Sequence, residues 1–296
     1  MNIIKNSNLW FRLSLLLIAL AVGALAGNAF VRGQLMNFGI DFTGGSLLNL
    51  RFEKPVDIGQ VRLVLDDFQI GESIIQKSGD TDLLIRTVPL EVETRQKIMA
   101  EITDKIGSLE ILEADIIGPT IGKELTTQAI WALLIASFGI IIYVSFRFEF
   151  KYAVAALLAL YHDALITTGV IALLWRTVDV TFVAAILTIM GYSINDTIVI
   201  FDRIRENLKK PSLAKKEFGE LVNISIWETM ARSINTVLTV LVIDLCLLFI
   251  GGETLRVFSL TLLVGLTLGA CSSIFVAPPL LVLWHKRETR GKVTRK

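Results

Sequence analysis

The sequence predicts a polytopic α-helical membrane protein with six transmembrane helices and one small α+β domain, which follows the first helix. Of the 296 residues, 53% are hydrophobic and 19% are charged, whereas soluble domains carry about 25% charged residues. The apolar residues also gather in six long runs. Because lipid offers no hydrogen-bond partner to a free backbone group, each run is expected to be a helix.

Each run is long enough to cross a hydrocarbon layer of about 30 Å, which takes about 20 helical residues. The runs are Leu9–Phe30, Thr127–Phe146, Tyr152–Trp175, Val180–Phe201, Ser233–Ile250 and Val257–Trp284. Pro278 and Pro279 in the last run should bend or end that helix. The first run has a second interpretation as a signal peptide cleaved after Ala26. Its length and the five further runs favour a retained span.

Lysine and arginine gather on one side of the predicted spans. With the N-terminus placed inside, the short outer loops hold only Arg176 and Arg256. Cytoplasmic loops carry such an excess of positive residues, so both termini are predicted to be cytoplasmic. The net charge of +1 indicates no nucleic-acid partner. The basic residues of the tail suit contact with membrane lipids.

The predicted domains follow from these spans. Residues 1–30 hold the cytoplasmic N-terminus and first helix, 31–126 an extracytoplasmic domain, 127–284 a five-helix bundle with a cytoplasmic loop at 203–232, and 285–296 a basic cytoplasmic tail. In the extracytoplasmic domain, strands are expected at Gly45–Glu53, Ser73–Lys77, Leu83–Thr87 and Leu109–Ile117, and helices at Asp57–Phe68 and Glu91–Ile106. This β-α-β-β-α-β order is the ferredoxin-like arrangement, which serves many functions and names none.

The sequence contains no motif that indicates an enzyme. Cys246 and Cys271 lie in separate apolar runs, which excludes a disulfide framework and a clustered zinc site. GPTIGKEL (Gly118–Leu125) is not a phosphate-binding loop, because it is one residue short and has Glu124 where serine or threonine is required. His162 and His285 are too few for a metal cluster. We therefore expect no catalytic activity, cofactor or metal.

Four ionisable residues interrupt the apolar runs: Asp163, Asp196, Asp244 and Arg232. A charge at the centre of a membrane helix costs roughly 2.5–3.5 kcal/mol, so each residue must face protein or water. Each is explained either by a structural hydrogen bond between helices or by a function. The immediate neighbours of Asp244 are apolar, which favours the structural explanation. For Asp163, which follows His162, the two explanations are balanced.

Asp196 has the richest surroundings of the four. Asn195 precedes it, and Gly191 and Ser193 lie about one turn earlier, where small residues let another helix approach closely. Low-dielectric surroundings favour the neutral form of a carboxyl group, and a nearby arginine favours its charged form. Helix movements that change the distance from Asp196 to Arg232 are therefore expected to load and release a proton.

Two further patterns concern packing and the membrane surface. Gly23–Gly27 and Gly265–Gly269 have the spacing that suits close helix packing, although this pattern is weak evidence. Asp202–Asn207 is expected to be a solvated, charged helix end that anchors the topology, with pairs among its acidic and basic side chains.

Several motifs, taken together and in this order, resemble those of the SecF family. They are GIDFTGG (Gly39–Gly45), GPTIGKEL, the His162-Asp163 pair, GYSINDTIVIFDRIREN (Gly191–Asn207) and ARSINTVLT (Ala231–Thr239). Members of this family are the smaller membrane subunits of the bacterial SecD–SecF pair, within the resistance-nodulation-division superfamily. The resemblance covers essentially the whole chain.

The resemblance implies a role in protein export at the bacterial cytoplasmic (inner) membrane. It implies pairing with SecD, work beside the SecYEG channel, and use of the proton motive force to move emerging preproteins. The implied proton-relay residues are Asp196 and Arg232, with Asn195 and Asp163 as further candidates. Gly39, Asp41, Gly44 and Gly45 would form a hinge to the outer domain. The alternatives are a proton-coupled exporter of small molecules or lipids, and a structural translocase subunit that moves no protons.

Overall fold

The computed structural model describes residues 2–293 and divides the chain into two compact units. Unit 1 consists of Met1–Asn37 with Ala132–Lys296, and unit 2 is Phe38–Trp131. Residues 294–296 at the end of the predicted basic tail lie outside the described residues, as does Met1.

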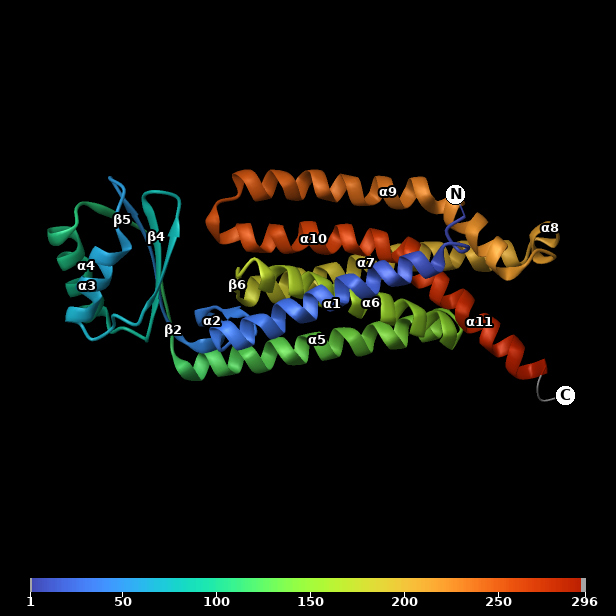
Figure 1. The fold of residues 1–296 in the computed structure, drawn as a ribbon, viewed down its shortest axis with the longest axis horizontal. Helices are drawn as coiled ribbons and strands as arrows, with labels where there is room; N and C mark the ends of the chain where they lie inside the picture. The colour runs from blue at the N-terminus through green and yellow to red at the C-terminus, as the bar shows by residue number, and fades with distance from the viewer. Residues whose placement is uncertain (1, 294–296) are drawn as a thin grey trace. The chain divides into compact units, whose positions relative to one another are not determined.

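In the part of the chain that the structure describes, six helical segments are long and apolar enough to cross a membrane, in agreement with the predicted polytopic architecture (Figure 1). They are α1 (Ser7–Arg32), α5 (Pro119–Arg147), α6 (Phe150–Leu173), α7 (Val180–Leu208), α9 (Phe218–Ile250), and the segment Leu255–Glu288, which includes most of α10 (Glu253–Phe275) and α11 (Ala277–Val293). Of these helices, α6, α7, α9 and α10 pack together and carry the buried polar residues described below.

The segment 203–232, predicted as a loop, is mostly helical. Helix α7 continues to Leu208 and α9 begins at Phe218, with only the short α8 (Pro211–Ala214) between them. Charged side chains one turn apart stabilise the last turns of α7. Glu206 contacts Arg203 at 2.7 Å and Lys210 at 3.4 Å. The apolar runs therefore located the long apolar helices correctly but not all of their ends.

The last span is broken where the sequence predicted it. Helix α10 ends at Phe275 and α11 begins at Ala277, so Pro278 and Pro279 fall in the first turn of α11. Proline is well tolerated there because the first amides of a helix have no intrahelical acceptor. Figure 1 shows α11 leaving the direction of α10 at this break.

Glycines set the closest helix contacts of unit 1. A Cβ atom on Gly265 would lie 2.1 Å from Cδ1 of Ile189 on α7, and one on Gly269 would lie 3.1 Å from Cβ of Ser193. The predicted packing role of the second glycine pair is thus confirmed. Gly23 and Gly27 on α1 have no described atom within 4 Å of a built Cβ, so for this pair the prediction was wrong within this chain.

Unit 2 has the predicted strand and helix order. Its elements are β2 (Gly45–Phe52), α3 (Ile58–Asp67), β3 (Ile74–Ser78), β4 (Asp82–Thr87), α4 (Val92–Lys105) and β5 (Leu109–Ile117). The strands form one antiparallel sheet in the order β3-β4-β2-β5. Figure 1 shows both helices on one face of this sheet. Leu48 and Leu50 of β2 are buried in the core together with apolar residues of α3 and α4.

Three short elements complete the chain: β1 (Asn37–Phe38), α2 (Ile40–Thr43) and β6 (Thr177–Val178).

Candidate functional site

Two aspartates are buried among α6, α7, α9 and α10. Asp163 on α6 is 0% exposed, and Asp196 on α7 is 7% exposed. An acidic side chain at this position is tolerated only if protein groups replace the hydrogen bonds of water. For both residues those groups are mainly serine hydroxyls contributed by neighbouring helices.

Asp163 is bonded from three directions. Its Oδ2 atom accepts hydrogen bonds from Oγ of Ser193 on α7 at 2.8 Å and from Oγ of Ser272 on α10 at 2.6 Å. Its Oδ1 atom lies 2.9 Å from Nδ1 of the preceding residue, His162. The carboxylate therefore links α6 to α7 and α10 through Oδ2. The imidazole of His162 is the hydrogen-bond partner of Oδ1, which the serines do not reach.

Asp196 is held by two serines from different helices. Its Oδ1 atom accepts a hydrogen bond from Oγ of Ser233 on α9, and its Oδ2 atom accepts one from Oγ of Ser273 on α10, both at 2.5 Å. A hydroxyl is both a donor and an acceptor, so the same two serines are able to bond either the carboxylate or the carboxylic acid.

The two aspartates belong to one polar cluster. Ser272 and Ser273 are consecutive on α10 but donate to Asp163 and Asp196, respectively. On α7, Ser193 lies about one turn before Asp196 and donates to Asp163. The carboxylates are thus linked through α7 and α10, and any relative movement of these helices changes hydrogen bonds to both. We call these residues, with His162 and Ser233, the aspartate–serine cluster.

The structure brings only some of the predicted site residues together. Asp163 and Asp196 lie in the cluster, whereas the side chains of Arg232 and Asn195 are exposed. Among the described residues, the hydrogen bonds to Asp196 come from serines, and the one from α9 comes from Ser233, next to Arg232. Consecutive helical residues point about 100° apart, so only one of these two neighbours faces Asp196.

The serines of α10 were not singled out from the sequence. Ser272 and Ser273 stand in the apolar run Val257–Trp284, where a serine is easily taken for a small packing residue. The signal that could have identified them is the pair itself, because two adjacent hydroxyls in a membrane span need partners on two different faces. Ser193 was noted only for its small size.

The predicted hinge motif has its own geometry within unit 2. Gly44 and Gly45 have φ angles of +69° and +135°, which favour glycine. A Cβ atom on Gly45 would lie 2.4 Å from the carbonyl oxygen of Thr87, and one on Gly44 would lie 3.1 Å from Cα of Pro119. A Cβ on Gly122 would lie 2.9 Å from the amide nitrogen of Gly44. The GIDFTGG and GPTIGKEL motifs are therefore in direct backbone contact.

The other two residues of that motif belong to the short helix α2. Gly39 precedes the helix in an extended conformation, and its carbonyl oxygen accepts a hydrogen bond from Oγ1 of Thr43 at 3.1 Å. Asp41 lies in the first turn, where a negative charge suits the helix dipole.

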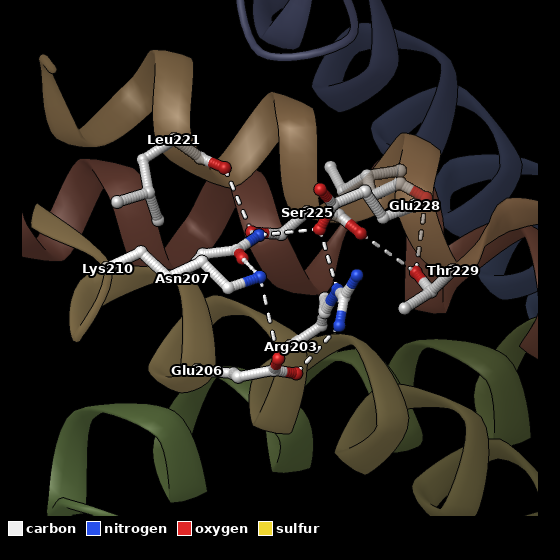
Figure 2. Close-up of polar contacts among 9 residues, drawn as sticks. Arg203, Glu206, Asn207, Lys210, Leu221, Ser225, Glu228 and Thr229 are labelled. Carbon is white, nitrogen blue, oxygen red and sulfur yellow. Dashed lines mark hydrogen bonds and ion pairs between the residues drawn. The ribbon is translucent and has the colours of Figure 1, made fainter. Parts of the chain in front are cut away.

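A second polar network joins α7 to α9 at the end where α7 stops (Figure 2). Asn207 is 0% exposed, and its Nδ2 atom donates to Oγ of Ser225 at 3.0 Å and to Oε2 of Glu228 at 2.7 Å. Lys210 donates to Oδ1 of Asn207 at 2.9 Å, and Nε of Arg203 donates to the same glutamate at 2.6 Å. The expectation of a solvated charged end was therefore wrong for Asn207, because α9 covers it.

Comparison with known families matches both parts of the chain. The family described as "Protein export membrane protein SecD/SecF, C-terminal" matches residues 97–287, and the "SecD/SecF GG Motif" matches residues 36–56, which contain Gly44 and Gly45. These matches define the class as that of the SecD/SecF export membrane proteins.

Comparison with individual relatives shows to which member of this class the chain is similar. The protein translocase subunit SecF of Sebaldella termitidis is 39% identical over 100% of this chain and 97% of its own length. The SecF subunit of Pseudomonas aeruginosa is also 39% identical, over 95% of this chain and 90% of its own length. The chain belongs to the SecF family of bacterial protein translocase subunits.

Solved structures agree with this assignment. SecDF of Thermus thermophilus, described as a translocon-associated membrane protein, matches with a TM-score of 0.87 and 38% identity over 97% of this chain. SecDF in a super-membrane-facing form matches with a TM-score of 0.73 and 37% identity over 100% of this chain. This chain spans 39% and 40% of those two longer chains.

Proposed function

We propose that the protein is an auxiliary, non-enzymatic subunit of the Sec export machinery that couples inward proton flow to late-stage movement of preproteins across the cytoplasmic membrane. The observation that carries the proposal is the position of Asp196, a buried carboxyl group held by hydroxyls from two different helices. Membership of the SecF family supplies the export role.

The hydrogen bonds of Asp196 explain how a proton would change the structure. As a carboxylate, Asp196 accepts from Ser233 on α9 and Ser273 on α10. When it is protonated, its own O–H must donate, and one serine has to turn from donor to acceptor or lose its bond. Each protonation state thus has its own pattern of hydrogen bonds between α7 and the helices α9 and α10. Where one helix arrangement suits one pattern better, proton binding shifts the conformational equilibrium.

The membrane potential supplies energy of a suitable size. One elementary charge that crosses 100 mV gains about 2.3 kcal/mol. A loss of one or two charge-assisted hydrogen bonds involves about 1.5–3 kcal/mol each. The two quantities are comparable, so proton transfer at Asp196 is able to drive a small helix movement.

We further propose SecD as the partner, with the SecYEG channel and the preprotein as the wider assembly. The solved relatives are single SecDF chains, of which this chain matches less than half. Arg232 and Asn195 are exposed in this chain. In the proposed assembly they face the partner and complete the relay with its residues.

Unit 2 is proposed to be the extracytoplasmic domain, with both termini in the cytoplasm. Its β-α-β-β-α-β order and the strand order β3-β4-β2-β5 support the ferredoxin-like assignment. The backbone of the Gly39–Gly45 motif contacts the beginning of α5, which supports the proposal that the motif transmits helix movement to this domain.

The test is Asp196→Asn in vesicles that contain SecD, the channel and a trapped preprotein. Asparagine keeps the shape of the side chain and, like the protonated acid, accepts one hydrogen bond and donates another. It is unable to bind or release a proton, so proton-motive-force-dependent completion should be lost. Asp202→Asn, at an exposed position of the same helix, is the matched control and should retain it. Full stimulation by assembled Asp196→Asn protein would instead identify a structural subunit that moves no protons.

A further inference from the structure

Asp244 on α9 and Ser259 on α10 are buried polar residues outside the aspartate–serine cluster. Asp244 is 3% exposed and Ser259 is 0% exposed. Ser259 lies close enough to Asp244 to act on its carboxyl group, although the two side chains do not reach hydrogen-bond geometry. Among the side chains that the structure describes, both carboxylate oxygens and this hydroxyl have no hydrogen-bond partner. Buried polar groups are nearly always paired, so this arrangement requires an explanation.

The pair is separate from the aspartate–serine cluster. Asp244 follows Ser233 by eleven residues on α9, which is about three turns and about 16 Å along the helix. Both residues, with Val237 between them, belong to the buried face of α9. A group bound at Asp244 is therefore too far away to share the hydrogen bonds of Asp196.

The surroundings of Asp244 do not support a negative charge. Ser259 is the polar side chain that faces it from α10, the helix packed against this part of α9. Arg256, one turn earlier on α10, is exposed and has interactions of its own. Removal of a charged carboxylate from water costs several kcal/mol unless a counter-charge or hydrogen bonds replace the solvent. The described part of the chain brings neither to Asp244.

We propose that Asp244 and Ser259 form a second proton-binding site of the bundle. A bound proton removes the charge and turns one carboxyl oxygen into a donor, which Ser259 Oγ is able to accept. A small rotation of the hydroxyl then satisfies both side chains together. Proton binding at Asp244 does not depend on the export role proposed above.

Proton occupancy of this site is linked to the packing of α9 against α10. The neutral acid is compatible with the closed, water-free contact, whereas the carboxylate needs water or a cation. The state with α9 and α10 packed therefore binds the proton more tightly than a state in which they separate. It follows that alkaline conditions weaken this contact and acidic conditions strengthen it.

Infrared difference spectroscopy of the full chain in phospholipid vesicles tests the proposal directly. At mildly acidic pH, Asp244→Asn should remove one protonated-carboxyl band that is present in the wild type. Ser259→Ala should retain that band but shift its frequency, because the acid loses its acceptor. Asp202→Asn, which alters an exposed carboxyl group, should leave the band unchanged.

A second measurement follows the melting temperature against pH. The wild type should lose stability relative to Asp244→Asn as the pH rises, since only the wild type acquires a buried charge. An unchanged carboxyl band in Asp244→Asn, or a melting-temperature difference that does not vary with pH, would overturn the proposal. If Asp244→Asn fails to fold, an unshifted band in Ser259→Ala overturns it instead. Neither readout involves Asp196 or export, so this inference and the proposed function fail independently.

Discussion

Ser272 and Ser273 are adjacent on α10, yet their hydroxyls donate to two different buried aspartates, at 2.6 Å to Asp163 and at 2.5 Å to Asp196. One turn of a single helix thus holds both acidic groups of the bundle core that are hydrogen-bonded by serines. A movement of α10 therefore changes the hydrogen bonds of both carboxyl groups together. This arrangement makes α10 the element on which single substitutions should separate their roles.

Ser273→Ala should impair proton-driven export more than it impairs folding. It removes one of the two hydrogen bonds to Asp196, and a hydrogen bond to a charged group contributes about 1.5–3 kcal/mol. We expect the rate of the proton-driven step to fall by about tenfold or more. Vesicle translocation assays measure this rate. Ser145→Ala, at an exposed position of α5, should have no effect, and equal losses in both variants would contradict the assigned role.

Gly45→Ala should destabilise unit 2 severely. An alanine Cβ would lie 2.4 Å from the carbonyl oxygen of Thr87, at a φ angle of +135°. The backbone strain alone costs about 1–3 kcal/mol, and the contact with a rigid carbonyl adds to it. Limited proteolysis and thermal unfolding of the full chain measure the loss.

Gly79→Ala is the matched control for that variant. Gly79 also has a positive φ angle, +83°, but no atom of the described residues lies within 4 Å of a built Cβ. Only the strain of about 1–2 kcal/mol remains. If both alanine variants unfold alike, the close contact with Thr87 is not what requires glycine at position 45.

Asn207→Ala should loosen the junction of α7 and α9. The change leaves Ser225 and Glu228 without the donor that now reaches both of them (Figure 2). A hydrogen bond to a charged group contributes about 1.5–3 kcal/mol, so loss of the bond to Glu228 should lower the melting temperature and raise hydrogen exchange at the end of α7. Lys216→Ala breaks an exposed pair with Glu220 and should change stability by less than about 1 kcal/mol.

Acid should weaken unit 2 partly through Asp82. A hydrogen bond from Arg51 holds the pKa of the Asp82 carboxyl below its ordinary value. A depressed pKa contributes stability above the unfolded-state pKa of about 3.9, and this contribution is lost as the pH falls through the folded-state pKa. The pair is partly exposed, so its contribution is at most about 1 kcal/mol.

Comparison of the wild type with Asp82→Asn isolates this contribution. The stability difference between the two proteins should be present at neutral pH and should shrink below about pH 4. Thermal unfolding at a series of pH values measures it. A difference that stays constant down to the lowest pH would show that ionisation of Asp82 does not contribute to stability.

The sequence was sufficient for the architecture because large, repeated signals determine it. Six apolar runs, the prolines at 278 and 279, and strands separated by amphipathic segments each reflect many residues, so single ambiguities do not matter. The sequence placed the end of α7 too early and the beginning of α9 too late. Charged residues continue a helix into water as readily as they end a membrane span.

The site was only partly predictable, because its partners depend on which way single side chains face. Asp163 and Asp196 were visible as charges in apolar runs. Arg232 and Ser233 point about 100° apart around α9, and only one of them faces Asp196. An error of one residue in the predicted orientation of the helix is enough to select the wrong one. Ser272 and Ser273 gain their importance only from the neighbouring helices, which a sequence does not place.

Gly265 and Gly269 also determine how α7 and α10 are able to slide. Ile189 occupies the notch at Gly265, and Ser193 lies against Gly269, so the two contacts advance by four residues on both helices. A partial slide would push the isoleucine against the bulkier residues between the glycines. A slide of one turn, about 5.4 Å, would seat it at Gly269 instead. Axial movement between these helices therefore has discrete stops, like a ratchet, and the serine–aspartate bonds would be exchanged in whole steps.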